Sequence, residues 1–460
     1  MTLCSVMLSH VALITFTLSF CDTRPVNYQT SSSSRRGNKL IIILLDAFRW
    51  DYFEIQGLKG FERLMKRGVK AKYMISDFPS ESFPNHYSIT TGLHVESHGM
   101  VGNRMYDPAT NDTFKAGLGE NDTDPKWWNG GEPIWITGRK HDRKSFMYSW
   151  LGCEVEIRGL RPNFCDAYSY DNGSFETNFK YMIDSGIRNL LEDGADLIGI
   201  YIEDPDHFGH RYGPFSDVLN KTVLNIDKHI DYLQDQLAEH QLTDEVNIMI
   251  MSDHGMTQLD LTKMINVTKY MSAEERERLT NNYRNNIEYP MFSLWPKLGK
   301  EEEVYELLKN ENPHMQVYQK GFLPEEWHYK HNPRVAPIVV TDDIPWYMVL
   351  DTLEKHYDFK VFNDTGRPVQ GGHAFGNRER DMRAIFLATG PDFKSGERDL
   401  PPVDIVDLYQ MMCHVLKIPA APNNGSWEHA ASYLEDVGTY GVHSSLGLVV
   451  VVGCLFVMMF

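Results

Sequence analysis

The sequence has few positively charged residues for its length. It contains 45 Lys and Arg against 63 Asp and Glu, which gives a formal net charge of −18 at pH 7. A protein that binds a nucleic acid polymer needs clustered Lys and Arg to neutralise phosphates, so this composition argues against that class. A polyanionic substrate would also be repelled unless a local cationic centre overcame the field.

Cysteine is also scarce, with six residues in a chain of 460. Three of them lie in or beside the apolar ends of the chain, which leaves Cys153, Cys165 and Cys413 in between. Cys153 and Cys165 would close a short loop, and in an oxidising compartment we predict a disulfide there, which stabilises by about 3 kcal/mol through chain entropy. Cys413 is then either a buried thiol or the link to a second chain in a homodimer.

Basic residues are absent from both ends of the chain. Residues 1–21 are predicted to be a secretory signal peptide, and residues 22–38 a linker. Residues 446–460 carry no charge and are fewer than the roughly 20 apolar residues that a spanning helix needs. We therefore predict a removed glycolipid-anchor signal, with its attachment site in the spacer 428–445. The expected location is the outer leaflet, on the extracellular face of the plasma membrane, with secretion as an alternative.

Sequons for N-glycosylation are spread along the chain. One such tripeptide is weak evidence, but seven of them on a chain with a signal sequence indicate secretion. The predicted glycosylation sites are Asn111, Asn121, Asn172, Asn220, Asn266, Asn363 and Asn424.

Apolar runs inside the chain predict a parallel β-sheet. KLIIILLDAFR, ADLIGIYIEDPD, VNIMIMSDHG and RAIFLATGPD are rich in Ile, Val and Leu, which is typical of strands covered by helices on both faces. Helical periodicity between them, as in LNKTVLNIDKHIDYLQDQLAEH, completes a doubly wound, mostly parallel α/β fold. We assign the catalytic domain to residues 39–427, within which about 268–347 is less regular and is expected to be an insertion or a smaller subdomain.

Three of these runs end in acidic residues. Because ligands bind outside the carboxyl ends of parallel strands, the acids should gather on one rim, although each alone could be a helix cap or a turn. Histidines accompany them, one of them in the glycine-rich loop QGGHAFGN. Carboxylate and imidazole ligands suit Zn²⁺, and also Mn²⁺ or Fe²⁺. The predicted ligands of two metal ions are Asp46, Asp206, His210, Asp253, His254 and His373.

Other histidines are less suited to a metal site. His94 and His98 have the spacing of a helical ligand pair but are expected to be structural, and His86 and His207 have no evident partner. We therefore leave these four out of the predicted centre.

The stretch SESFPNHY, residues 80–87, holds the candidate nucleophile. A serine before Pro-Asn is more often a turn or cap, and its hydroxyl is a poor nucleophile unless a base or a metal lowers its pKa. A zinc ion in the predicted centre could do this for Ser82. Pro84 favours a helix that starts here, and a helix N-terminus favours negative charge. We predict that Ser82 is the nucleophile and that Ser80 is structural.

At these residues the chain resembles the ectonucleotide pyrophosphatase/phosphodiesterase family of the alkaline phosphatase superfamily. The resemblance covers nearly all of residues 39–427. It rests on LLDAFRWDY, SFPNHYSITTGLHVESHGMVGNRMYDP, WWNGGEPIWIT, EDPDHFGHRYGP, MIMSDHGM, QGGHAFGN and PNNGSW, in the same order. It implies an alkaline-phosphatase-like core and a metal-dependent phosphoric diester hydrolase.

The resemblance also implies a role for each site residue. The ligands of one zinc ion would be Asp206, His210 and His373, and those of the other Asp46, Ser82, Asp253 and His254. Asn103 would donate its amide to a phosphate oxygen. Ser82 would attack phosphorus and form a phospho-serine that water then hydrolyses, while two zinc ions roughly 4 Å apart clamp the attacking and leaving oxygens.

Two departures from the usual family pattern bear on the substrate and the metal. Most members have threonine where this chain has Ser82, whereas serine is typical of the choline-specific glycerophosphodiester branch, the sixth member, which MYSWLGCEVEIRGLRPNFC also resembles. The second departure is HAFGN, where the family usually reads His-Gly-Tyr-Asp-Asn. The acid behind His373 is thus missing, and losing such a partner can weaken metal binding about 10- to 100-fold.

A choline group needs aromatic faces and a carboxylate, because a quaternary ammonium cannot donate hydrogen bonds. We look for them near the predicted disulfide, although each aromatic could instead pack in the core. The candidates are Trp127, Trp128, Tyr148, Trp150, Tyr201, Glu154 and Glu156. The sequence thus predicts that glycerophosphocholine or lysophosphatidylcholine is hydrolysed to phosphocholine.

Other functions remain as alternatives. SFPNHYSITTGLHVESHG resembles the nucleotide-type members more, which favours a nucleotide pyrophosphatase/phosphodiesterase. A phosphomonoesterase would want more basic contacts to phosphate, and a sulfatase needs Cys/Ser-x-Pro-x-Arg, which SESFPN lacks. A surface recognition protein that had lost catalysis would usually lack a ligand or the nucleophile, and here neither is missing.

Overall fold

The computed structural model describes residues 38–116, 122–169, 175–260, 262–281, 286–288, 291–349 and 371–435. The predicted signal peptide and anchor signal lie outside these ranges, as do Asn121, Asn172 and Asn363. The other four predicted glycosylation sites are exposed or partly exposed. Among the described residues, no helix combines the length and the apolar character needed to cross a membrane.

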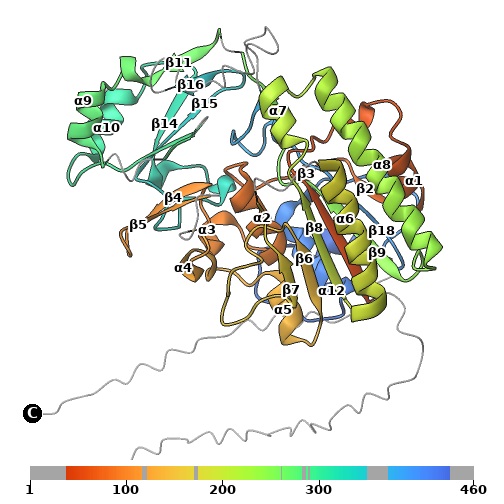
Figure 1. The fold of residues 1–460 in the computed structure, drawn as a ribbon. Coiled ribbons are helices and arrows are strands. Elements are labelled where there is room, and N and C mark those ends of the chain that lie inside the picture. Colours follow the sequence, from red (N-terminus) through yellow and green to blue (C-terminus); the bar gives the residue numbers. More distant parts are fainter. Residues whose placement is uncertain are drawn as a thin grey trace, which may run out of the picture. The chain divides into compact units, whose positions relative to one another are not determined.

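An eight-stranded sheet forms the centre of the catalytic region, in the order β19-β2-β18-β9-β1-β8-β6-β7 (Figure 1). Strands β9, β1, β8, β6 and β7 are parallel, and β2 and β19 are parallel to each other. The strands are β1 (Lys39–Leu45), β2 (Gly68–Ala71), β6 (Ser145–Tyr148), β7 (Phe164–Asp166), β8 (Leu197–Ile202), β9 (Val246–Met251), β18 (Phe386–Thr389) and β19 (Glu397–Leu400).

One predicted parallel strand runs the other way. β18, from RAIFLATGPD, is antiparallel to both β9 and β2. The chain enters β18 soon after His373, which lies close to His254 just beyond the carboxyl end of β9. A strand that starts at that edge has to run antiparallel to β9, so the prediction of a parallel strand is wrong here.

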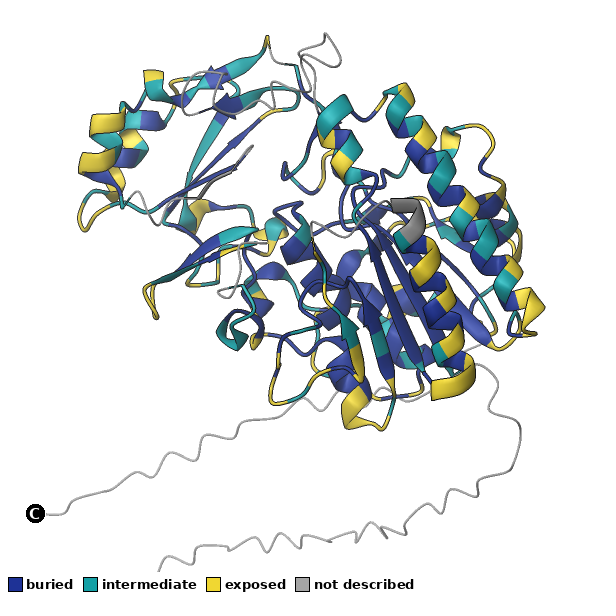
Figure 2. Ribbon diagram, viewed as in Figure 1, coloured by how far each residue is buried: buried dark blue, intermediate teal, exposed yellow. Residues whose placement is uncertain are grey.

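The sheet is covered by helices on both faces, as the apolar runs predicted. Alternate residues of β1 enter two separate core clusters, Ile41 and Ile43 on one face and Leu40 and Ile42 on the other. The first cluster includes side chains of α1 (Lys59–Arg67), α6 (Phe175–Arg188) and α8 (Asp217–Glu239). The second includes those of α2 (Ser82–Thr91), α5 (Ile134–Lys140) and α12 (Leu408–Val415). Apart from Lys39 at the start of β1, the residues of the central strands β1, β8 and β9 are accordingly all buried (Figure 2).

The less regular part of the sequence forms a subdomain with its own core. Its antiparallel sheet has the order β12-β13-β15-β14, and α9 and α10 pack against it. The elements are α9 (Ala273–Leu279), β12 (Asn286–Glu288), β13 (Met291–Leu294), α10 (Glu301–Leu308), β14 (Met315–Gln319) and β15 (Ile338–Asp342). Arg334 joins this subdomain to the catalytic region through Asp107 and the carbonyls of Gly99 and Lys126.

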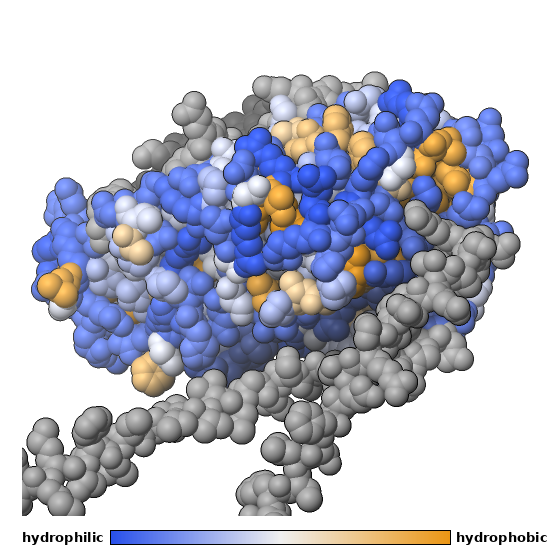
Figure 3. Space-filling model, turned by 90° about the horizontal axis from the view of Figure 1, so that it is seen from below, coloured by the Kyte–Doolittle hydropathy of each residue, from blue (hydrophilic) through white to orange (hydrophobic). Residues whose placement is uncertain are grey.

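Short elements complete the described chain. The helices are η1 (Tyr52–Glu54), α3 (Val95–His98), α4 (Pro125–Trp128), η2 (Asn189–Asp193), α7 (Asp206–Tyr212), η3 (Val267–Lys269), η5 (Lys320–Phe322), η6 (Glu325–Trp327), η8 (Arg380–Met382), η9 (Ile405–Asp407) and α13 (Trp427–Ala431). The strands are β3 (Met74–Ile75), β4 (Arg104–Asp107), β5 (Asp112–Lys115), β10 (Thr257–Gln258), β11 (Met264–Asn266), β16 (Tyr347–Val349), β17 (Gly371–Gly372) and β20 (Val403–Asp404). On the face drawn in Figure 3 the surface is mostly hydrophilic, with hydrophobic residues in separate patches.

The cysteines take two different environments. Cys153 and Cys165 form a disulfide bond, which ties the loop after β6 to strand β7. Cys413 is a free thiol on α12 with 2% of its surface exposed. A thiol buried there cannot reach a second folded chain, so the predicted homodimer through Cys413 does not fit the structure.

Candidate active site

The predicted acids meet at one rim of the central sheet. Asp46 follows β1 and Asp253 follows β9, while Asp206 begins α7, four residues after β8 ends. His254 lies between the first two, with its Nε2 atom 3.4 Å from Asp46 Oδ1 and 3.4 Å from Asp253 Oδ2. Parallel strands that end together therefore deliver three carboxylates to one place.

Two groups of side chains at this rim have the composition of metal sites. In the first, His210 Nε2 lies 3.4 Å from Asp206 Oδ1, His373 Nε2 lies 3.7 Å from the same oxygen, and the two nitrogens are 3.0 Å apart. Asp206 and His210 stand one turn apart on α7, so they share a face of that helix. His373 reaches them from the glycine-rich loop after β17.

In the second group, Ser82 joins Asp46, Asp253 and His254. Its Oγ lies 3.4 Å from His254 Nε2. A tetrahedral zinc ion with bonds of about 2.0–2.1 Å holds its donor atoms about 3.3 Å apart. The separations in both groups are close to that value, so the two sets of side chains fit the ions that the sequence predicts.

The three imidazoles are oriented as metal ligands usually are. The Nδ1 atoms of His210, His254 and His373 lie 3.1, 2.9 and 2.8 Å from the carbonyl oxygens of Gly371, Gly255 and Ser80. Each Nδ1–H donates to its carbonyl, which leaves the lone pair on Nε2 directed at the cluster.

One oxygen of each carboxylate also faces the cluster without a partner. Asp46 Oδ2 accepts the Tyr201 hydroxyl at 2.6 Å, and Asp253 Oδ1 accepts the backbone N–H groups of Ala47 and His254. Asp46 Oδ1, Asp253 Oδ2 and Asp206 Oδ1 are buried and have no hydrogen-bond partner. Burying anionic oxygen without a partner is costly, so this donor set calls for a cation.

The pKa values of the ligands reflect the same deficit of positive charge. Burial raises the pKa of Asp206 to about 7, and burial with the charges of Asp253 and Asp206 raises the pKa of Asp46 well above its usual value. Burial likewise lowers the pKa of His210 and that of His373. Without a cation, Asp46 and Asp206 favour the neutral carboxyl and His210 and His373 the neutral imidazole, and a divalent metal would restore the two ionised carboxylates.

Ser82 is the first residue of α2 and is held by a residue that the sequence did not single out. Asn85 is fully buried and donates to the carbonyls of Pro79 and Glu81, while its Oδ1 accepts the N–H of Asp77. The side chain of Asn85 thus fixes the loop that leads into Ser82, the predicted nucleophile. The only indication of this role in the sequence was that Asn85 carries an amide within the turn-forming segment FPN.

Asn103 is fixed from two sides. Its Oδ1 accepts the N–H of Phe83 at 3.0 Å, and its own N–H donates to the Glu81 carboxylate. The carbonyl end of the amide is therefore bound to the start of α2, beside Ser82. The remaining NH₂ end is free of that contact and suits the predicted phosphate oxygen.

Ser80 matters more than the sequence indicated, through its backbone. Its carbonyl accepts both His373 Nδ1 and the N–H of Ala374, whereas its hydroxyl makes only a 3.3 Å bond to the Phe375 carbonyl. A backbone carbonyl thus orients His373, and the acid missing from HAFGN is not needed for this. Asn377, at the end of that motif, anchors the loop by donating to the Ser76 carbonyl.

The aromatic candidates for the choline site turn out to be core residues. Trp127, Trp128 and Trp150 are almost fully buried. Tyr201 is buried and donates to Asp46, so it fixes a predicted metal ligand. Tyr148 belongs to the core on the opposite face of the sheet and hydrogen bonds with Asn189, because alternate residues of β6 face opposite ways. The prediction that Tyr148 joins these residues in a pocket is wrong.

The two acidic candidates differ in their surroundings. Glu154 is partly buried, its buried Oε2 has no hydrogen-bond partner, and burial raises its pKa. Glu156 is exposed and faces Arg161 at 4.0 Å. The structure therefore keeps Glu154 as a candidate for a buried cation and excludes Glu156.

Two aromatic rings that contact predicted site residues were missed. Phe83 follows Ser82 directly and packs 6.1 Å from the Trp128 ring. Tyr168 is half-buried, 5.5 Å from the Tyr201 ring, and lies three residues after the disulfide. The contact between Tyr168 and Tyr201 joins residues that are distant in the sequence, so no local pattern indicates it.

Comparison with known proteins matches the sequence of this chain to one family. The family described as type I phosphodiesterase/nucleotide pyrophosphatase matches residues 40–367. Human ectonucleotide pyrophosphatase/phosphodiesterase family member 5 is 34% identical over 389 residues, covering 85% of this chain and 76% of that protein. A bis(5'-adenosyl)-triphosphatase of Xenopus laevis is 33% identical over 414 residues, 90% of this chain and 85% of its own. Mouse family member 7 is 31% identical over 411 residues, 86% of this chain and 87% of its own.

Solved structures show the same fold. An inactive variant of murine ectonucleotide pyrophosphatase/phosphodiesterase 5, in complex with AMP, superposes with a TM-score of 0.77 at 32% identity. The match covers 86% of this chain and 100% of that one. The human counterpart gives a TM-score of 0.76 at 34% identity, covering 86% of this chain and 99% of its own.

Proposed function

Because this chain belongs to the type I phosphodiesterase/nucleotide pyrophosphatase family, we propose that it is a two-zinc ectoenzyme that cleaves choline-containing phosphodiesters to phosphocholine. Glycerophosphocholine and lysophosphatidylcholine are the proposed substrates, at the extracellular face of the plasma membrane. The observation that carries the choline specificity is the Glu154 carboxylate, whose Oε2 is buried and has no hydrogen-bond partner. A trimethylammonium group could neutralise it without donating a hydrogen bond.

A chain of contacts links Glu154 to the reacting groups. The Cys153–Cys165 disulfide places Glu154 beside the segment that leads to Tyr168. The Tyr168 ring contacts Tyr201, whose hydroxyl binds Asp46. A choline group at Glu154 would therefore lie on the same side of the sheet as the metal cluster, with Tyr168 available as an aromatic face.

The metal centre would use the two groups of side chains already described. One ion would be held by Asp206, His210 and His373, and the other by Asp46, Ser82, Asp253 and His254. When bound, the zinc ions would supply positive charge that lowers the pKa of the Ser82 hydroxyl and neutralises the phosphoryl oxygens.

The residues of the chain would carry out a double displacement. Ser82 Oγ attacks phosphorus as the bond from phosphorus to the leaving alcohol oxygen breaks, which leaves a phosphocholine ester on Ser82. The N-terminus of α2 favours the negative charge that gathers there. Asn103 donates its amide to a non-bridging oxygen and orients the phosphate. Water then breaks the bond between Ser82 Oγ and phosphorus, releases phosphocholine and restores the hydroxyl.

A nucleotide substrate is the second candidate. Its support is the relatives, one of which is a bis(5'-adenosyl)-triphosphatase, and a neighbouring structure that contains AMP. Phe83 and Tyr168 could stack on a base as well as face a choline group. The same metals and nucleophile would serve either substrate, so the choice depends on the pocket around Glu154.

The substrate class is tested by comparing p-nitrophenyl esters of phosphocholine, of thymidine monophosphate and of phosphate alone on the zinc-loaded protein. We expect the phosphocholine ester to have the highest kcat/KM. Glu154→Gln should lower that value about 10-fold or more through a raised KM, since it removes a charge at a desolvated cation site. Glu156→Gln, two residues further on and exposed, is the matched control and should change little.

The opposite results are equally clear. A preference for the thymidine ester, unchanged by Glu154→Gln, would replace the choline proposal with the nucleotide one. A preference for the plain phosphate ester would argue against a phosphodiesterase.

A further inference from the structure

His86 is a buried imidazole that no part of the proposed reaction uses. Its surface is 1% exposed, and neither ring nitrogen has a hydrogen-bond partner. Its ring lies against Tyr201, 4.6 Å between centroids, and 5.9 Å from Trp150. Because a buried polar group without a partner is costly, the position of His86 needs an explanation.

The polar atom that faces His86 belongs to the metal cluster. His86 Nε2 lies 3.6 Å from Asp253 Oδ2. The other oxygen of Asp253 is already used by two backbone N–H groups, whereas Oδ2 has no partner. Nε2 could donate to Oδ2 after a movement of about 0.5 Å, which would bring the pair to an ordinary hydrogen-bond length.

Helix α2 connects this pair to the nucleophile. Ser82 and His86 are four residues apart on α2, so both side chains project from one face of the helix. Ser82 Oγ approaches His254 Nε2, and His86 Nε2 approaches Asp253 on the same metal group. One turn of a buried helix therefore carries the nucleophile and a donor to a ligand of the same ion.

We propose that His86 is a positioning residue of the metal centre, which donates its Nε2–H to Asp253 Oδ2. This inference rests on the proposed zinc site that includes Ser82. Tyr201 likewise donates to Asp46, although it binds Oδ2, the oxygen turned away from the cluster, whereas His86 faces Asp253 Oδ2, which is turned toward it. The two donors also contact each other, so the carboxylates are held by one packed unit.

A role as a direct ligand is less suited to His86. The group of Asp46, Ser82, Asp253 and His254 already supplies the four ligands of a tetrahedral ion. The nearest ligand atoms of His86, Asp46 and Asp253 lie within 4.8 Å of one another, so distance alone allows either role. A donor needs an N–H at the position of Nε2, whereas a ligand needs a lone pair there, and this difference can be tested.

The test measures zinc affinity, independently of turnover, by competition with a chromogenic chelator. In His86→Leu, one of the two zinc ions should bind about 10- to 100-fold more weakly, as for other lost supporting partners. In His86→Gln the amide nitrogen takes the place of Nε2, so most of the affinity should return. A direct ligand would not be rescued, because a glutamine amide is a poor zinc donor.

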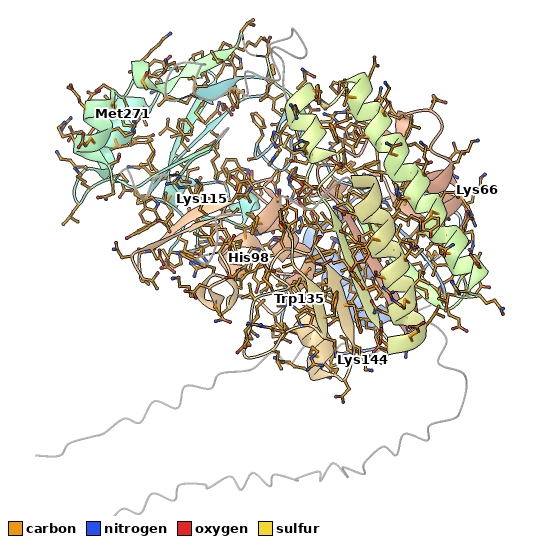
Figure 4. All side chains as sticks on the ribbon, viewed as in Figure 1. Lys66, His98, Lys115, Trp135, Lys144 and Met271 are labelled. Carbon is orange, nitrogen blue, oxygen red and sulfur yellow. A yellow bond between two sulfur atoms is a disulfide. The ribbon has the colours of Figure 1, made fainter. Side chains whose placement is uncertain are left out.

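His98 provides the matched control. It is another buried histidine, labelled in Figure 4, but its partners are Ser88 and the N–H of Met100. His98→Leu should lower the melting temperature and leave both zinc affinities unchanged. If His86→Leu does not fold, His86→Asn replaces it, since its amide is too short to reach Asp253 and should weaken the same zinc ion.

Two results would overturn the inference alone. The first is that the wild type binds two zinc ions and the His86→Leu variant binds both with the same affinity. The other is a His86→Gln variant as weak as His86→Leu. A wild type that binds no zinc would instead overturn the proposed function, and this inference with it.

Discussion

Replacing Ser82 with alanine is expected to lower phosphodiester turnover by at least about 10³-fold, because the variant has no oxygen to attack phosphorus. Zinc should remain bound, since Asp46, Asp253 and His254 still surround the second ion and the first group is untouched. The measurement is kcat on p-nitrophenyl phosphocholine together with the zinc content of the same sample.

Ser80→Ala is the matched control for this variant. Ser80 is fully buried and lies two residues before Ser82. Its hydroxyl makes only the 3.3 Å bond to the Phe375 carbonyl, and the substitution leaves the backbone carbonyl that orients His373 unchanged. We expect turnover within a few-fold of the wild type, because the variant loses only one weak hydrogen bond. If Ser82→Ala kept comparable turnover, the covalent mechanism would have to be abandoned.

Removal of the metal is expected to abolish turnover and to make the folded chain less stable at neutral pH. Three carboxylates then share a buried rim, each with an oxygen that has no partner. Zinc should restore turnover and raise the melting temperature, because a ligand that binds only the folded chain stabilises it by mass action. Turnover and melting temperature are measured before chelation, after it, and after zinc is returned.

Asp206→Asn should separate these two effects. The pKa of Asp206 in the metal-free fold is about 7, above its value of 3.8 outside it, so the folded chain holds this proton more tightly. Stability is therefore lost as pH rises from about 4 to about 7. The variant escapes this loss, so without metal it should be more stable than the wild type at pH 7.5, by on the order of a few kcal/mol, and equal at pH 4. With zinc present the order should reverse, because the variant lacks a ligand.

Asp342→Asn is the control for this reversal. Asp342 is buried in the subdomain, burial raises its pKa well above the usual value, and its Oδ1 has no partner. Because it does not belong to the metal cluster, its replacement should change stability by the same amount with and without zinc. An Asp206→Asn variant that behaved in this way would contradict the assigned metal site.

The meeting of the predicted metal ligands at one rim could be predicted because several of them follow strands that are recognisable in the sequence as apolar runs. Asp46 and Asp253 each end an apolar run, and the carboxyl ends of parallel strands meet at one rim. Asp206 and His210 have helical spacing. His373 could be predicted from its glycine-rich loop and from the family resemblance. Each of these features is visible in a short stretch of the sequence.

The supporting residues could not be predicted in the same way, because they depend on register and on tertiary packing. The sequence suggested Tyr201 as an aromatic residue of the substrate site, but the register of β8 brings its hydroxyl to Asp46, to which it donates a hydrogen bond. Ser80 acts through a carbonyl that every residue has, so its side chain gave no signal. His86 did have a signal, since it stands one helical turn after Ser82, but its partner comes from a strand 167 residues further on.

The direction of β18 and the environment of Cys413 also could not be predicted from the sequence. An apolar run does not reveal whether its strand is parallel, and only the path of the chain from His373 determines that. A single unpaired cysteine is compatible with a core thiol or an intermolecular bond, and the packing of α12 decides between them. In each case a nonlocal contact supplied the missing information.

The most direct test of the central claim is to trap the covalent intermediate. Zinc-loaded protein would be mixed with p-nitrophenyl phosphocholine, quenched in acid within one turnover, digested and examined by mass spectrometry. We expect a phosphocholine adduct on the peptide that contains Ser82, at Ser82 itself, and none in Ser82→Ala. Full turnover without an adduct, or an adduct on another residue, would contradict it.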